Sequence, residues 1–201
     1  MAGLTVESVR ERYGAVCARA GEGVTVVAAT KYVSVHDLAI LADAGIEVVG
    51  ENRAQDLLAK HAVYGDAFRW HFIGHLQSNK VKVVNLLCEL VHSLSSESAA
   101  ARLTVPALLE VNLSEETTKS GAAPGEIASY LRQFESIRGL MTMPPPAADP
   151  EESRSYFRRL AELAAEHDLR ELSMGTSQDY RVAVQEGATH VRIGGALFRG
   201  H

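Results

Sequence analysis

The chain has 201 residues, of which 46% are hydrophobic and 22% are charged, and this composition is typical of a soluble globular protein. Lys and Arg number 20 against 25 Asp and Glu, a formal net charge of −5 without any basic block, so we expect no nucleic acid as a partner. The length suits one domain over residues 1–201, so we expect no substantial second domain.

Short β-branched apolar runs alternate along the chain with longer amphipathic segments, a pattern that indicates βα units around a parallel sheet. A helix is predicted over residues 6–20, before the first strand. The predicted strands cover residues 24–29, 46–49, 70–73, 90–94, 107–111, 137–141, 171–174 and 189–193. The predicted helices between them cover residues 34–44, 53–63, 79–87, 124–134, 151–167 and 178–186.

This alternation predicts an α/β fold, a single (β/α)8 TIM-type barrel, with an open doubly wound sheet as the alternative. Too few residues follow the last strand for an ordinary closing helix, so we expect the N-terminal helix to replace it. The crossover over residues 95–106 is near the lower limit of about a dozen residues for a parallel connection. Its helix is therefore expected to be short or irregular, unless residues are missing there.

Cysteine usage and the N-terminus indicate the compartment. Cys17 and Cys88 lie far apart, and neither belongs to a CxxC motif, so we expect neither a disulfide framework nor a zinc site. The N-terminus lacks a basic region followed by an apolar one, and no apolar run approaches about 18 residues. We therefore expect a cytoplasmic protein with no membrane contact.

Polar residues follow the predicted strands, at the ends where barrel active sites are built. Lys31 comes directly after the first strand, where it would point into the barrel mouth. A desolvated lysine in such a place becomes a nucleophile that forms Schiff bases with carbonyl compounds. A lysine that reaches out to solvent is the alternative interpretation.

Small residues and hydroxyl groups follow the seventh and eighth strands, in the loops that usually bind phosphate in this fold. The segment SMGTSQD leads into the predicted helix 178–186, whose first amides can bind an anion. Gly194 and Gly195 would let a phosphate approach the backbone, and Arg192 offers a cation. Ordinary glycine turns beside a surface arginine are the alternative. A lysine facing a phosphate site suits pyridoxal 5′-phosphate (PLP), a phosphorylated aldehyde cofactor.

Other motifs give weaker evidence for a functional site. No carboxylate or third histidine lies at metal-ligand spacing from His71 and His75, so we expect core packing or a polar pocket wall there and no metal. Lys119 and Gly121 are candidates for a loop over the barrel mouth, with an ordinary solvated loop as the alternative.

Several segments together resemble one family. They are VAATKYV, GENRAQ, WHFIGHLQSNK, EVNLSEETTKSG, IRGLMTM and LSMGTSQDYRVAVQEGATHVRIGGALF, in this order from about residue 24 to 198. The chain resembles the pyridoxal phosphate homeostasis proteins, single-domain relatives of the alanine racemase N-terminal barrel. The cofactor-binding residues that this resemblance implies are Lys31, Asn52, Met141, Ser173, Thr176, Ser177, Arg192, Gly194 and Gly195.

The resemblance also implies roles for these residues. Lys31 would carry PLP as a Schiff base, Asn52 would lie beside the ring, and Arg192 near the pyridine nitrogen. Ser177 and the glycine backbone would hold the phosphate. Ala29 stands where the family often has a second lysine, and SMGTS replaces the usual SMGMS. The family is also typically longer between the fourth and fifth strands.

The resemblance implies a PLP-binding protein that stores or delivers the cofactor in balance with amino and keto acids, without an established turnover. PLP-dependent apo-enzymes are the expected partners, and we expect a monomer. One alternative is an amino-acid racemase, although we expect no second domain that would supply an opposing base. Another is a barrel aldolase that acts on a sugar phosphate through Lys31.

Overall fold

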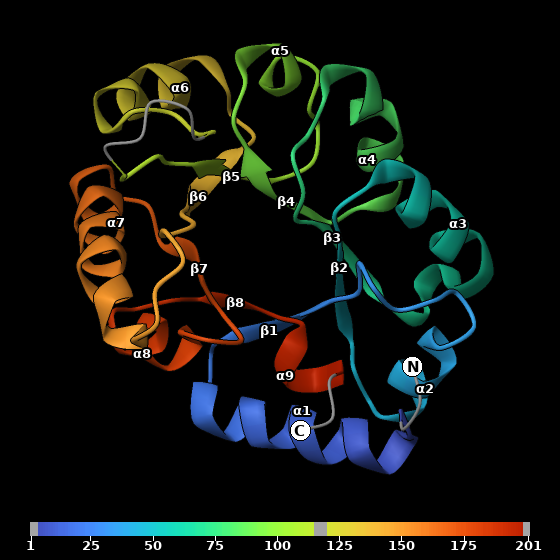
Figure 1. Ribbon diagram of the computed structural model, residues 1–201. Helices are drawn as coiled ribbons and strands as arrows, with labels where there is room; N and C mark the ends of the chain where they lie inside the picture. The colour runs from blue at the N-terminus through green and yellow to red at the C-terminus, as the bar shows by residue number, and fades with distance from the viewer. Residues whose placement is uncertain (1–3, 115–119, 199–201) are drawn as a thin grey trace.

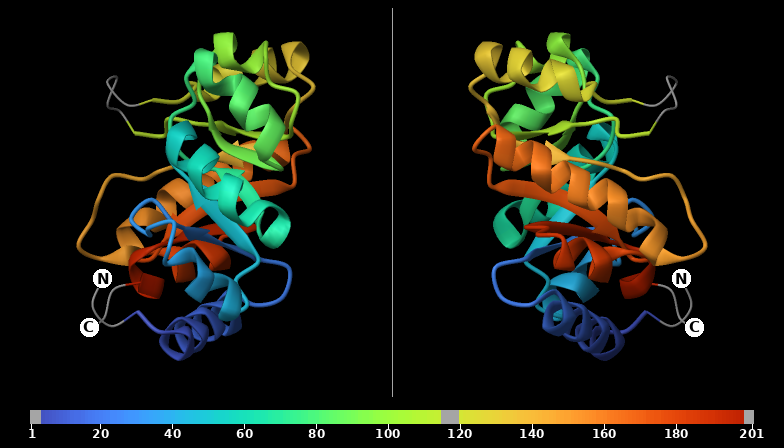
Figure 2. Two further views of the ribbon diagram at one scale, coloured as in Figure 1. Left: turned by 90° about the vertical axis from the view of Figure 1, so that its right-hand side faces the viewer. Right: turned by 90° about the vertical axis from the view of Figure 1, so that its left-hand side faces the viewer.

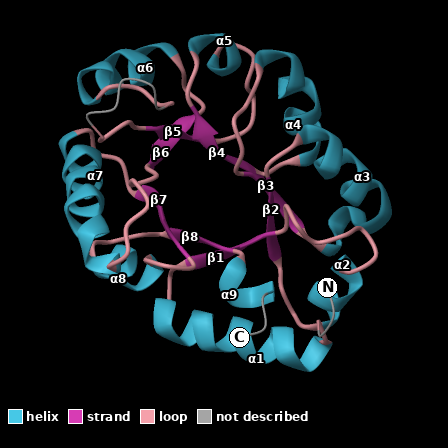
Figure 3. Ribbon diagram, viewed as in Figure 1, coloured by secondary structure: helices cyan, strands magenta, loops and turns pink. Residues whose placement is uncertain are grey.

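The computed structural model describes residues 4–114 and 120–198, and its strands form a closed parallel barrel inside a ring of helices (Figures 1 and 3). The strands pair in chain order and β8 pairs with β1, so the predicted barrel is confirmed. The strands are β1 (Thr25–Ala29), β2 (Val48–Glu51), β3 (Arg69–Phe72), β4 (Leu90–Leu94), β5 (Ala107–Glu110), β6 (Ile137–Met141), β7 (Glu171–Thr176) and β8 (His190–Ile193).

The helices differ widely in length. They are α1 (Val6–Ala20), α2 (Leu38–Asp43), α3 (Ala54–Tyr64), α4 (Val81–Leu87), α5 (Glu97–Ala100), α6 (Ile127–Gln133), α7 (Arg154–Glu166), α8 (Tyr180–Gln185) and α9 (Gly195–Phe198). Short 3-10 turns are η1 (Gly65–Ala67), η2 (Ser78–Lys80), η3 (Pro124–Glu126) and η4 (Pro150–Ser153). Figure 2 shows the barrel from two sides, with the connection between β6 and η4 projecting from one end. No helix in the described ranges is long and apolar enough to span a bilayer.

The N-terminal helix completes the outer ring, as predicted. Figure 1 shows α1 outside β8 and β1, between α2 and α8. Thr5 and Ser8 form a capping box at its start, and it buries Val9 and Val16. The helix after β8, α9, has only four residues and packs against α1.

The short crossover between β4 and β5 contains a single helical turn, α5, in agreement with the predicted short or irregular helix. A neighbouring helix supports the rest of the connection. The side chain of Asn85 on α4 donates to the Arg102 carbonyl at 2.9 Å and accepts from the Thr104 amide at 3.0 Å. One side chain therefore satisfies backbone groups that a longer crossover helix would pair internally.

Some elements begin or end later than the sequence pattern predicted. α2 starts only after a turn in which Ser34 and Asp37 hydrogen-bond with each other. α8 likewise starts after a turn in which the Asp179 carboxylate accepts from the Thr176 amide. β2 extends to Glu51 and β7 to Thr176, so both reach further toward the barrel mouth than expected.

The inside of the barrel is polar at several positions. His190 and Arg192 lie two residues apart on β8 and therefore face the same side of the sheet. Ring contacts place His71 and His92 against His190. The largest completely buried apolar side chains include Trp70, Phe72, Phe157, Leu57 and Ile127.

Candidate functional site

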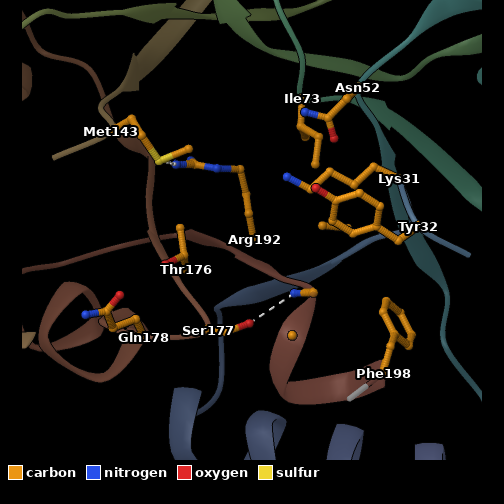
Figure 4. A pocket seen from close by; sticks show the side chains of 13 residues that line it. Lys31, Tyr32, Asn52, Ile73, Met143, Thr176, Ser177, Gln178, Arg192 and Phe198 are labelled. Atoms are coloured by element: carbon orange, nitrogen blue, oxygen red, sulfur yellow. Dashed lines mark hydrogen bonds between the residues drawn. The ribbon is translucent and has the colours of Figure 1, made fainter. Parts of the chain in front are cut away.

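A cavity of about 400 Å³ opens where β1, β2, β7 and β8 end, as expected for a barrel active site (Figure 4). Its lining combines cations, hydroxyl groups, glycine backbone and a few apolar side chains. The described lining residues are Ala29, Lys31, Tyr32, Asn52, Ile73, Met143, Thr176, Ser177, Gln178, Arg192, Gly194, Gly195 and Phe198. The structure thus brings most of the predicted site residues together.

Lys31 lies at the rim of the cavity, just beyond β1, where the sequence placed it. Its side chain is exposed rather than desolvated, and its Nζ lies 5.0 Å from the ring centroid of Tyr32. Figure 4 shows the amine directed across the cavity toward the wall that carries Arg192. An aldehyde arriving from solvent can therefore reach this amine.

A cup of hydrogen-bonding groups, formed by Ser177 and the amides of Gly194 and Ala196, lies at the β8 side of the cavity. The Ser177 Oγ accepts from the Gly194 amide at 3.2 Å and from the Ala196 amide at 3.1 Å. A Cβ added to Gly195 would lie 3.8 Å from Ser177 Oγ, an ordinary van der Waals contact, so it would occupy space beside the cup without a clash. The Ser177 hydroxyl hydrogen is not used in these two bonds, so it can donate to a phosphate oxygen.

Thr176 lines the cavity, but its hydroxyl group already has a partner. Both its amide and its Oγ1 donate to Asp179 Oδ1, at 2.7 and 3.0 Å. The backbone at Gly175 makes this turn possible, because its φ of +91° suits glycine and a Cβ there would lie 2.6 Å from Ala183 Cβ. The Thr176 hydroxyl group is therefore already used within the protein, and the residue forms part of the cavity wall next to the cup.

Arg192 forms the wall opposite Lys31 and is only 5% exposed. Burial lowers the pKa of Arg192 to about 10, so the guanidinium stays charged at neutral pH. It donates to Ser173 Oγ at 2.5 Å and to the Thr142 carbonyl at 3.2 Å. Within residues 4–114 and 120–198, neither Lys31 nor Arg192 pairs with a carboxylate. The described lining thus includes two cationic side chains and no carboxylate, and although nearby carboxylates also attract the Arg192 guanidinium, the cavity favours an anionic ligand.

Two predicted site residues, Met141 and Ser173, do not line the cavity. Met141 is buried against Leu90 inside the barrel, and Met143 reaches the cavity instead. Residues two apart on a strand share a face but lie about 6.6 Å apart along it, so Met141 sits a layer deeper. Ser173 is completely buried and contacts Arg192 from below.

Asn52 follows β2 and contributes a polar atom to the cavity wall. Its Oδ1 is buried and has no hydrogen-bond partner in the described part of the chain. The loop after β3 packs tightly on its backbone, since a Cβ on Gly74 would lie only 2.1 Å from the Asn52 carbonyl oxygen. A buried polar atom without a partner is stabilised when a ligand supplies one.

A buried ion pair lies behind the two strand ends that carry Lys31 and Asn52. Lys60 on α3 donates to Glu51 Oε1 at 2.5 Å and to the Thr30 carbonyl at 2.8 Å. The Thr30 hydroxyl also donates to Glu51 Oε1, at 2.5 Å. This cluster ties β1, β2 and α3 together, directly beside both site residues.

The remaining candidates lie elsewhere. His71 is buried in the barrel core, as predicted, whereas His75 is exposed. The described residues contain no group of three or more metal-ligating side chains that could hold a metal ion. Lys119 lies outside the described residues, and Gly121 packs beside the Asn112 backbone.

The sequence interpretation missed several lining residues, namely Tyr32, Ile73, Met143, Gln178 and Phe198. Tyr32, Ile73, Met143 and Gln178 each adjoin or follow a strand end that the sequence had already singled out. A rule that includes the neighbours of each strand end would have found them. Phe198 belongs to α9, and only the packing of that helix brings it to the cavity.

Comparison with known proteins finds relatives that match over nearly the whole chain. A protein of Aquifex aeolicus (strain VF5), named pyridoxal phosphate homeostasis protein, is 39% identical, and the match covers 94% of this chain and 94% of that protein. PipY of Synechococcus elongatus PCC7942, solved with PLP bound, is similar with a TM-score of 0.85 and 30% identity, over 95% of this chain and 100% of that one. No family model matches the chain.

A more distant likeness concerns the fold alone. The lysine/ornithine decarboxylase of Vibrio vulnificus, solved with putrescine, has a TM-score of 0.69 and 15% sequence identity. The match covers 96% of this chain and 62% of the decarboxylase. It shows a shared barrel.

Proposed function

Because the chain belongs to the pyridoxal phosphate homeostasis protein family, we propose that it binds PLP in the cavity at the ends of β1, β2, β7 and β8. It stores or delivers this cofactor, in balance with amino and keto acids, and acts in PLP homeostasis. One observation carries the proposal. The Lys31 amine, the Arg192 guanidinium and the cup at Ser177 converge on a single cavity, and its volume of about 400 Å³ suits a small ligand.

The residues of the cavity fit PLP in charge and in shape. Lys31 and Arg192 provide positive charge for a phosphorylated ligand. The Ser177 oxygen accepts from the two neighbouring amides, which leaves its hydroxyl hydrogen to donate to a phosphate oxygen. Gly195 leaves open the space that a Cβ would fill. The buried Oδ1 of Asn52, which has no hydrogen-bond partner among the described residues, can accept a hydrogen bond from a ligand.

Each residue then has a role. Ser177 and the backbone at Gly194 and Gly195 would hold the phosphate, and Lys31 would hold the cofactor covalently. Arg192 would face the ring nitrogen, and Asn52 would lie beside the ring. When bound, PLP supplies an aldehyde that condenses reversibly with primary amines. Because Lys31 is exposed at the rim, the amine of an acceptor can approach it from solvent. This openness supports release as well as storage.

The lining also supports a carrier in preference to a racemase. The described lining residues include no carboxylate and no imidazole. Lys31 and Tyr32, which could exchange protons, lie on the same side of the cavity (Figure 4). Racemisation needs an acid and a base on opposite faces of the substrate carbon, so this arrangement favours cofactor handling without rapid turnover.

We further propose PLP-dependent apo-enzymes as recipients, a monomeric state and a cytoplasmic location. The exposed rim around Lys31 and Tyr32 supports direct access by an acceptor protein. Cys17 and Cys88 are both free thiols, which suits a reducing compartment.

Borohydride reduction tests the proposal. The purified protein is reduced, digested and analysed by peptide mass, and we expect a pyridoxyl adduct on the peptide that contains Lys31. Lys31→Ala should remove the adduct and the visible absorption of the bound cofactor. Lys82→Ala, on the exposed face of α4, is the matched control and should retain both.

The same measurement separates the alternatives. An adduct on another lysine would overturn the role of Lys31. A wild-type protein that remains unmodified after incubation with PLP and borohydride would overturn PLP binding itself and revive the aldolase alternative. Alanine racemisation at about 1 per second or faster would overturn the carrier function.

A further inference from the structure

Beneath the cavity, a chain of hydrogen bonds leads from Arg192 into the barrel core. Arg192 Nη1 donates to Ser173 Oγ at 2.5 Å, and this oxygen lies 2.7 Å from Nδ1 of His92. The Nε2 of His92 lies 2.9 Å from Nδ1 of His71. Ser173 and His92 are completely buried and His71 is 2% exposed, so the chain is shielded from solvent.

The chemistry of these groups determines the direction of each hydrogen bond. A guanidinium can only donate, so Ser173 Oγ accepts from Arg192 and gives its own hydrogen to His92 Nδ1. A neutral His92 then carries its proton on Nε2, from which it donates to His71 Nδ1. Every donor in the chain therefore points away from the cavity.

Burial keeps the imidazoles in the neutral form that this chain requires. Desolvation lowers the pKa of His92 well below its usual range, and nearby histidine and arginine charges add to the effect. Desolvation also lowers the pKa of His71 to about 3. His190, whose ring centroid lies 5.3 Å from that of His92, has a pKa lowered to about 4 by burial and by Arg192. Protonation of Nδ1 on His92 would remove the acceptor for Ser173.

The chain holds the Arg192 guanidinium in one orientation. A serine hydroxyl group rotates freely unless its hydrogen and a lone pair are both engaged. Because His92 takes the hydrogen, Ser173 presents a lone pair to Nη1 of Arg192, while the Thr142 carbonyl accepts from Nη2. Nη2 also donates to the Met143 sulfur at 3.7 Å. Two anchored nitrogens define the plane of a guanidinium, and the N–H of Nε and the second N–H of Nη1 are left for the cavity that Arg192 lines.

We propose that Ser173, His92 and His71 are positioning residues that direct an N–H of Arg192 at the ring nitrogen of PLP and so keep that nitrogen unprotonated. The inference rests on the proposed function, since it concerns how this chain holds the same cofactor. An unprotonated ring nitrogen makes PLP a weak electron sink. The buried chain would therefore suppress side reactions on bound amines while the cofactor is stored.

The test uses PLP labelled with ¹⁵N at the ring nitrogen and bound to the full-length protein. The ¹⁵N chemical shift reports directly whether the nitrogen is protonated or accepts a hydrogen bond. In wild-type protein we expect an unprotonated nitrogen that does not titrate between about pH 5 and pH 8. In Ser173→Ala we expect a protonated or titrating nitrogen, together with PLP binding that is weaker by about tenfold.

Ser93→Ala is the matched control, because Ser93 is also a buried barrel serine and its hydroxyl group donates to the Gly74 carbonyl. It should leave the ¹⁵N signal unchanged. A second pair of variants acts one step further along the chain. His92→Leu removes the acceptor for Ser173 and should shift the signal, whereas His92→Asn retains an acceptor near Nδ1 and should resemble wild type.

The outcomes are distinct. An unchanged ¹⁵N signal in Ser173→Ala and in His92→Leu, with PLP still attached to Lys31, would overturn the positioning role and leave the proposed function intact. Equal shifts in Ser173→Ala and Ser93→Ala would also overturn it, because the effect would then be general loosening. Failure of the wild-type protein to take up PLP would overturn the proposed function, and the positioning role with it. If Ser173→Ala does not fold, the His92 pair decides the question.

Discussion

Gly195 faces the cup with an α-carbon that carries no side chain, and its φ is not in the left-handed region. An alanine therefore fits the backbone, but its Cβ would project to within 3.8 Å of Ser177 Oγ, where the phosphate is proposed to bind. We expect Gly195→Ala to weaken PLP binding by about tenfold or more while stability changes by less than about 1 kcal/mol. Titration followed by the visible absorption of bound PLP and thermal unfolding without PLP measure the two effects.

The control for this substitution is Gly14→Ala in the middle of α1. A Cβ on Gly14 meets nothing within 4 Å, so this variant should gain slightly in stability and bind PLP normally. Normal PLP affinity in Gly195→Ala would show that the phosphate does not lie in the cup.

The positions of single residues could be predicted from the sequence where they follow the end of a strand. Lys31 and Ser177 line the cavity as expected, because barrel strands end at one common rim. Met141 was expected at the cavity but lies deeper, because the sequence pattern does not show how far each strand extends toward the rim. Met143 lies on the same face two residues later and reaches the cavity.

At the scale of elements, the ion pair between Glu51 and Lys60 connects β1, β2 and α3. The pair is buried, since the side chains of Glu51 and Lys60 are 0% and 5% exposed. Lys60→Met would leave the Glu51 carboxylate buried without its counter-ion, and its Oε2 already has no described partner. We expect the free energy of unfolding to fall by about 3–5 kcal/mol. The double variant Glu51→Gln, Lys60→Met should recover much of this loss, and urea unfolding of the three proteins measures both effects.

The exposed pair Arg69–Glu89 is the comparison, because its side chains are 56% and 52% exposed at a similar N–O distance of 2.8 Å. Arg69→Met should change stability by less than about 1 kcal/mol, since water solvates either partner alone. Equal losses from Lys60→Met and Arg69→Met would contradict a special role for burial.

At the scale of elements, the sequence predicted every strand and most helices, because apolar periodicity is a local property of the chain. It misplaced the start of α2, since the hydrogen bonds between Ser34 and Asp37 compete with the first helical turn. It identified the unusual crossover before β5 from length alone. The support of that crossover by Asn85 was not visible, because the contact spans 17 residues to Arg102.

For the whole molecule, the buried histidines make stability depend on pH. Burial lowers the pKa of His71 to about 3 and of His190 to about 4, and it places the pKa of His92 well below 6.5. All three are neutral in the folded protein and bind protons below about pH 6.5 when unfolded. Their contribution to the free energy of unfolding is complete above that pH and is lost as the pH falls toward 4. With three such groups, the slope of the free energy of unfolding against pH approaches about 4 kcal/mol per pH unit.

Urea unfolding at several pH values between about 7 and 5 measures this slope. His190→Gln removes one titrating group, so its slope should be smaller by about 1.4 kcal/mol per pH unit. Identical slopes in wild type and His190→Gln would show that His190 is not held neutral by the fold.

By itself, the sequence determined that the chain forms eight βα units with an N-terminal helix in the outer ring. It also determined that Lys31, Arg192 and the glycine-containing turn after β8 face one rim. These features follow from periodicity and from position relative to strand ends, which are local. Only the tertiary structure decided that Arg192 is held through Ser173 by a buried chain of histidines. His92 and Ser173 are 81 residues apart, and they meet only because closing the barrel turns alternate residues of distant strands toward one interior.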